Sequence, residues 1–99
     1  MFFINVIKTY RDVVAICDKE LLGKIFENEK FQLNVKENFY KGKEVSESEL
    51  IKIIENLSRE DSTFNIVGRK SVDVALKTGI IIQEGIKEIQ GVPFALVLL

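Results

Sequence analysis

Residues 62–79 read Ser-Thr-Phe-Asn-Ile-Val-Gly-Arg-Lys-Ser-Val-Asp-Val-Ala-Leu-Lys-Thr-Gly, and this stretch decides the fold. Residues 63–67 are mostly β-branched or aromatic, which predicts a strand. After Gly68 the apolar residues recur at helical spacing, and Gly79 fits the left-handed position that ends many helices. The stretch therefore predicts a strand followed by a helix whose buried stripe consists of Val72, Ala75 and Leu76.

Upstream, two apolar runs at 2–8 and 13–17 predict strands joined as a hairpin, because only a short polar connection separates them. Asp18 then fits the N-cap of a helix over 18–27. Its apolar face would consist of Leu21, Leu22, Ile25 and Phe26. Gly23 weakens this helix by about 1 kcal/mol relative to alanine.

The middle of the chain alternates at 31–36, which predicts a strand with one buried and one wet face. A loop over 38–43 follows. Ser46 and Glu49 then form the signature of a capping box, and the apolar residues up to Leu57 recur at helical spacing.

The C-terminal part is rich in isoleucine and leucine. Residues 80–82 fit a short strand or a buried connector, and 86–89 favour a strand over a helical turn. Pro93 places the start of the last strand after it, at 94–98. The predicted order is β-β-α-β-α-β-α-β-β, an α+β fold with a single mixed sheet of four to six strands covered by three helices.

Composition bounds the function. The 99 residues are 46% hydrophobic and 29% charged, which predicts a single globular domain over 1–99. No histidine is present, so Ser-His-Asp and Cys-His catalysis and histidine-ligated metals are excluded. The lone Cys17 lies in an apolar run and is expected to be buried. We expect no cofactor, no metal site and no catalytic residue.

The N-terminus carries no signal pattern and the longest apolar run is too short to span a bilayer, so a cytoplasmic protein without membrane contact is expected. The richness in Ile, Lys and Glu suits a thermophile. The net charge of −1 means that any nucleic-acid contact needs a local basic patch.

Several short motifs together resemble an archaeal family known only as domain of unknown function 424, over essentially the full chain. They are Phe3-Ile4-Asn5-Val6, Asp18 before Leu21-Leu22-Gly23, Asn65-Ile66-Val67-Gly68, Ser71-Val72, Ala75, Gly79-Ile80-Ile81 and Gly91-Val92-Pro93-Phe94-Ala95. The resemblance implies a short intracellular archaeal protein without an assigned reaction, often encoded near translation genes. Relatives commonly carry a histidine after Gly-Val-Pro, where this chain has Phe94.

The first candidate site is Gly68, Arg69, Lys70 and Ser71. The spacing does not fit a phosphate-binding P-loop, because the earlier glycine is missing and Lys70 does not directly follow Gly68. Cations at a helix N-terminus are unfavourable unless an anion binds there, so these residues could hold a phosphate or carboxylate. Alternatively the two cations point into water, or Ser71 is the N-cap.

The second candidate site is the loop that holds Tyr40, Lys41 and Lys43. An aromatic ring beside lysines can stack on bases and neutralise phosphates of single-stranded RNA. Alternatively the aromatic residues Phe39 and Tyr40 anchor the loop to the core.

The leading hypothesis is a non-enzymatic binding module for RNA or a ribonucleoprotein partner through these two sites. A small-molecule enzyme or regulator, with an anionic ligand beside Ser71 and Asn65, is the alternative. A third hypothesis is a structural subunit whose C-terminal strand, at a sheet edge, pairs with a partner or forms a homo-oligomer.

Overall fold

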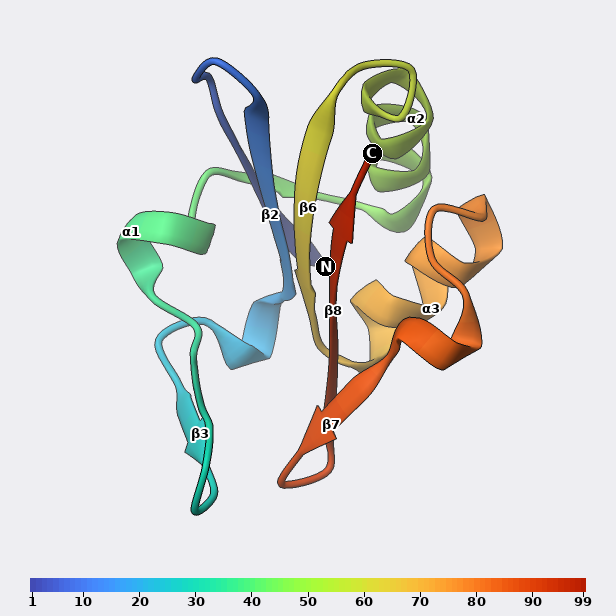
Figure 1. Ribbon diagram of the computed structural model, residues 1–99. Coiled ribbons are helices and arrows are strands. Elements are labelled where there is room, and N and C mark those ends of the chain that lie inside the picture. Colours follow the sequence, from blue (N-terminus) through green and yellow to red (C-terminus); the bar gives the residue numbers. More distant parts are fainter.

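The computed structural model describes all 99 residues, and its elements are arranged as two layers around one central sheet (Figure 1). The three α-helices are α1 (Glu37–Tyr40), α2 (Glu47–Leu57) and α3 (Arg69–Thr78). Two 3₁₀ turns are η1 (Lys19–Leu21) and η2 (Gln83–Gly85). The strands are β1 (Phe2–Ile7), β2 (Asp12–Asp18), β3 (Ile25–Glu27), β4 (Gln32–Asn34), β5 (Lys43–Val45), β6 (Ser62–Val67), β7 (Lys87–Ile89) and β8 (Val92–Leu98).

Six strands form a mixed sheet in the order β5-β1-β2-β6-β8-β7, and β3 and β4 form a separate hairpin. β2 and β6 run parallel at the centre, and every other pair in the sheet is antiparallel. The predicted α+β class and the mixed sheet are therefore confirmed, as is the hairpin of the first two strands. The number of helices is also three, but only α2 and α3 lie where helices were predicted.

One face of the sheet, called here the helix face, packs against α2 and α3. Alternate residues of β1, β2 and β6 enter this core, and Val14, Ile16 and Phe64 are fully buried there. The capping box is present at the start of α2, where Glu49 N–H donates to Ser46 Oγ. Gly79 ends α3 in the left-handed conformation, with φ of 81°, as the sequence predicts.

The opposite face, called here the second face, is covered only in part, by α1 and the β3–β4 hairpin (Figure 1). Cys17 and Tyr40 are buried in this second core beside Val35 and Val67. The burial expected for the lone cysteine is therefore confirmed. None of the helices is both long and apolar enough to cross a lipid bilayer.

The helix expected over 18–27 is wrong. Asp18 ends β2, η1 makes a single turn, and residues 25–27 form a strand of the hairpin. Gly23 has φ of 84°, a backbone conformation outside the range of a right-handed helix. It therefore prevents the helical turn η1 from continuing toward β3. The loop expected over 38–43 instead contains α1, and the last strand begins at Val92, before Pro93.

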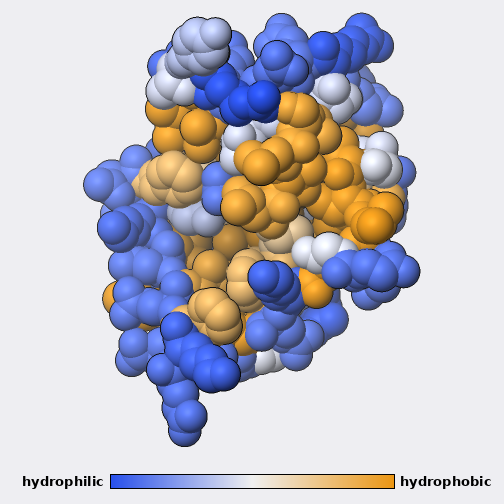
Figure 2. Space-filling model, viewed as in Figure 1, coloured by the Kyte–Doolittle hydropathy of each residue, from blue (hydrophilic) through white to orange (hydrophobic).

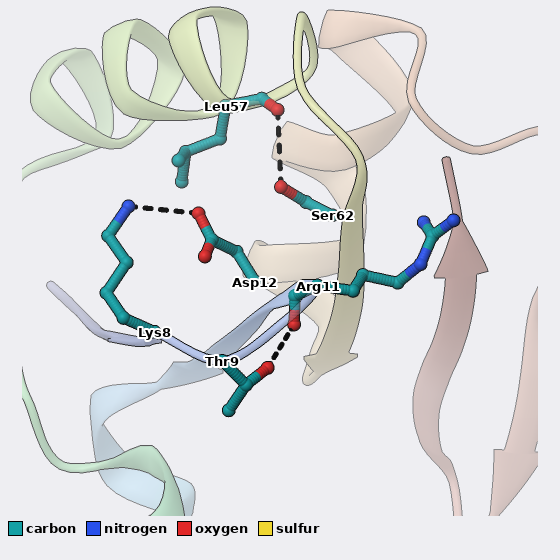
Figure 3. Close-up of polar contacts among 6 residues, drawn as sticks. All are labelled: Lys8, Thr9, Arg11, Asp12, Leu57 and Ser62. Atoms are coloured by element: carbon teal, nitrogen blue, oxygen red, sulfur yellow. Dashed lines mark hydrogen bonds and ion pairs between the residues drawn. The ribbon is translucent and has the colours of Figure 1, made fainter.

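The turn between β1 and β2 is fixed by polar contacts of its own residues (Figure 3). Lys8 Nζ lies 2.9 Å from Asp12 Oδ2, and the Thr9 hydroxyl donates to the carbonyl of Arg11. The hydrogen bond from Lys8 to Asp12 raises the pKa of Lys8. The Arg11 side chain extends toward β8 and donates to the carbonyl of Leu99.

Stability is expected to fall at alkaline pH because of the second core. Burial raises the pKa of Cys17 from 9.0 and that of Tyr40 from 10.0, each to about 12. Above pH 9 these groups ionise in the unfolded chain but stay protonated in the folded one, so stability is lost progressively as the pH rises from about 9 to 12. Urea-unfolding midpoints measured across this range check the loss.

Tyr40→Phe provides the control, because it keeps the buried ring and removes the hydroxyl. The variant should lose less stability than the wild type above pH 10, and the two should show the same pH dependence below it. Parallel curves above pH 10 would contradict the assignment of this loss to Tyr40.

Candidate functional site

The N-terminus of α3 is capped by a carboxylate of the chain itself, that of Asp18. The carboxylate of Asp18, at the end of β2, accepts hydrogen bonds from Ser71 N–H at 2.8 Å, Ser71 Oγ at 2.7 Å and Lys70 N–H at 3.2 Å. Asp18 and Ser71 are both buried. Because β2 and β6 run parallel, the end of β2 lies beside the turn that leads from β6 into α3.

Gly68 makes this contact possible. Its φ is 111°, which is unfavourable for residues with a side chain. A Cβ built at Gly68 would lie 2.4 Å from Cγ of Asp18, closer than any real contact. No side chain at position 68 caps the helix, so the cap comes from a residue 53 positions earlier than Ser71.

The side chains of the two cations of the first candidate site have other partners than Asp18. Arg69 and Lys70 are exposed. The Lys70 ammonium lies 3.6 Å from a carboxylate oxygen of Glu20, and the Arg69 guanidinium donates to the carbonyl of Gly91 at 3.4 Å. The unusual charge at this helix terminus is thus offset by Asp18. The Ser71 hydroxyl and the N–H groups of Lys70 and Ser71 are already engaged.

The second candidate site has an aromatic anchor instead of an exposed stacking platform. Tyr40 is buried, and its ring packs edge to face against Phe39 with the centroids 5.0 Å apart. Lys41 and Lys43 are exposed. β1 and β2 separate β5 from β6, so Lys43 and the start of α3 belong to regions about 14 Å apart across the sheet.

The small-molecule alternative called for a cavity beside Ser71 and Asn65. No cavity of the molecule is lined by either residue. Ser71 is buried in the first turn of α3, whereas Asn65 is half-buried on the second face, directly opposite Leu96. No three side chains of His, Cys, Asp or Glu gather in a way that could hold a metal ion.

A different candidate surface lies along β8. The sequence predicts this strand only as a possible edge of the sheet. β6 pairs with residues 94–98 on one side, but β7 pairs only with residues 92–94 on the other. The outer edge of β8 is therefore open from Ala95 to Leu98.

Backbone direction identifies the open groups. Leu99 N–H donates to Ser62, and Gly68 N–H donates to the carbonyl of Pro93, so odd-numbered residues of β8 face β6. Because backbone groups alternate in direction along a strand, the N–H and C=O of Leu96 and Leu98 point outward. No strand pairs with them there.

Apolar side chains surround these open groups. Leu96 is 64% exposed, Leu98 72% and Ile82 67%. A groove of about 260 Å³ runs between residues 80–82 and β8, and no charged side chain lines it. Figure 2 shows a continuous hydrophobic area over β8 and the connection from α3. We call Ile82, Leu96 and Leu98, with the outward backbone groups of the two leucines, the β8 patch.

The opposite edge of the sheet, β5, is built differently. It pairs with β1 over only three residues, and two of them, Lys43 and Glu44, are exposed and charged. Short length and charged side chains are the usual protection of an edge strand against unwanted pairing. Residues 95–98 have neither charge nor proline. In the sequence, the signal for this unprotected edge is the absence of charged residues from the predicted last strand.

Comparison with known proteins gives a family and a fold but no activity. The family model described as "Protein of unknown function (DUF424)" matches residues 7–99. A crystal structure of an uncharacterized conserved protein from Methanopyrus kandleri superposes with a TM-score of 0.84 at 26% identity. The match covers 98% of this chain and 90% of that one. No protein with a curated description matches the sequence.

Removing the Asp18 carboxylate should destabilise the protein strongly. Asp18→Ala leaves the Ser71 hydroxyl and two N–H groups without their buried acceptor, at a cost of about 2–4 kcal/mol of unfolding free energy. Asp18→Asn, which keeps one acceptor oxygen, should cost less. Chemical denaturation measures both variants.

Asp12→Ala, at the other end of the same strand, is the matched control. Its carboxylate pairs with the exposed Lys8 and caps no helix, so its loss should cost much less than the loss of the Asp18 carboxylate. Equal losses for the Asp12 and Asp18 variants would show that Asp18 does not organise the start of α3.

Proposed function

We propose that this chain, which belongs to the DUF424 family of proteins of unknown function, acts as a binding subunit that docks another protein strand along β8. The observation that carries the proposal is the open edge of Leu96 and Leu98. Strand addition to such an edge is a common way of recognising extended segments, in which main-chain hydrogen bonds supply affinity.

The chemistry of the β8 patch defines the kind of partner. The edge offers the N–H and C=O groups of two leucines, and the groove beside it is lined almost entirely by apolar residues. An incoming strand therefore needs small or branched apolar side chains and no charge next to Leu96. The structural-subunit hypothesis from the sequence is the one that the surface supports best.

Site-specific photo-crosslinking tests the proposal. A photoreactive residue in place of Leu96, in an extract of the source organism, should form discrete adducts whose mass identifies the docked chain. The same probe in place of the exposed Lys52 on α2 is the matched control and should form no such adduct. Adding Leu98→Lys should remove the Leu96 adducts, because an ammonium group would enter the apolar edge.

The proposal predicts adducts that depend on position. If the probes at Leu96 and Lys52 gave the same pattern, or if Leu98→Lys left the Leu96 adducts unchanged, β8 would not be a docking edge.

Binding of RNA or a ribonucleoprotein stays a prediction. The observation in its favour is that four cations, Arg69, Lys70, Lys41 and Lys43, keep exposed side chains. Their contribution would be electrostatic only, because the helix donors bind Asp18 and Tyr40 is buried. Such binding weakens steeply with salt.

Filter binding against total transfer and ribosomal RNA measures this prediction. Retention at low salt should fall in the double variant Arg69→Glu/Lys70→Glu and stay unchanged in Lys52→Glu, which alters a cation on α2. RNA retention that is absent at low salt, or that is indifferent to the double variant, would contradict RNA binding through the start of α3.

A further inference from the structure

We propose that the strand docked on β8 is β8 of a second copy of this chain, running antiparallel about a two-fold axis beside Val97. This inference rests on the proposed docking function and names its partner. A closed two-fold pairing is the commonest arrangement in soluble homo-oligomers.

The direction of the backbone groups selects one register. Residues of an antiparallel hydrogen-bonded pair exchange both N–H···O bonds. With Leu96 opposite Leu98 of the second copy, every outward N–H and C=O group of both residues finds a partner in both copies. A shift of one residue would present Val97, whose groups face β6, and a shift of two would present Phe94, whose edge β7 already covers.

The side chains suit the same register. Leu96 would lie beside Leu98 of the second copy on the second face, where both leucines are exposed. On the helix face the two Val97 side chains would meet at the axis, next to the groove lined by residues 80–82. Residues 92–99 have no charged side chain, so the pairing buries no unpaired charged side chain of β8 and sets no like-charged side chains of the two strands against each other.

The open window limits what can bind. It is bounded by β7, whose first residue, Lys87, lies opposite Phe94, so a docked strand can pair with only two outward-facing residues of β8, Leu96 and Leu98, before it reaches β7. A segment fits that window if it presents two residues, two positions apart, whose N–H and C=O groups point toward β8 and whose side chains are apolar. Each copy of the chain presents such a segment on β8. The contact is smaller than a standard interface, so we expect association at micromolar concentrations or above.

Cysteine pairing tests the register in the full-length chain. Val97→Cys places two thiols at a non-hydrogen-bonded pair, where Cα atoms are about 4.5 Å apart, within the range that a disulfide spans. Leu96→Cys places them diagonally, about 7–8 Å apart, which is too far. Under mild oxidation the Val97 variant should form a linked dimer about tenfold faster. The native Cys17 is buried and common to both variants.

Sedimentation velocity provides the measurement without cysteine variants. The weight-average mass should rise toward that of a dimer with concentration, and Leu96→Lys combined with Leu98→Lys should stay monomeric. Leu96→Lys combined with Leu98→Glu places opposite charges across the strands and should restore a dimer that dissociates with salt. Thermal unfolding of each variant establishes that it is folded.

The outcomes separate the two proposals. A chain that stays monomeric, with equally slow oxidation of both cysteine variants, overturns self-pairing. Docking of a different protein still stands in that case if the probe at Leu96 yields a specific adduct with another chain. Adducts of the chain with itself support both proposals, and the absence of any specific adduct removes both.

Discussion

The contact between the Asp18 carboxylate and the N-terminus of α3 joins the parts of this fold. It links the last residue of β2 to the first turn of α3, and it does so across the central parallel pair of strands. A buried carboxylate must be hydrogen-bonded, and the free N–H groups of a helix terminus are among the best donors available. The close approach requires a residue without a side chain at Gly68. Register, turn and helix start are therefore fixed together.

This contact also explains how two cations can be tolerated at the N-terminus of α3. Arg69 and Lys70 look like an anion-binding site in the sequence, because cations are unfavourable at that end of a helix. In the folded chain the same helix terminus already binds the carboxylate of Asp18, and the Lys70 ammonium pairs with Glu20. Sequence reasoning identified the electrostatic anomaly correctly. It could not find the compensating charge, since Asp18 lies about fifty positions away and nothing local links it to Ser71.

The elements that sequence predicted well are those with local signals. The capping box of Ser46 and Glu49, the stripe of α3 and the glycine that ends it all depend on contacts within a few residues. The failure at 18–27 has a similar origin. Leu21, Leu22, Ile25 and Phe26 match helical spacing, but the second face needs a cover that a short hairpin supplies. The positive φ of Gly23 is compatible with the hairpin and not with a helix, but the sequence shows only that a glycine is present.

The candidate site shows the same division. The sequence identified the apolar run at the C-terminus, whereas its place beside β6 with half its edge open depends on pairings across the whole chain. The uncovered part of β8 then differs from the two terminal strands of the sheet, since β5 and β7 carry exposed charges and residues 95–98 do not. In the proposed dimer, the open edge of β8 in each copy would be covered by the other copy. The free edges left in such a dimer, β5 and β7, are each three residues long and carry two exposed charged residues, so they would not recruit further copies and growth into fibres would be blocked.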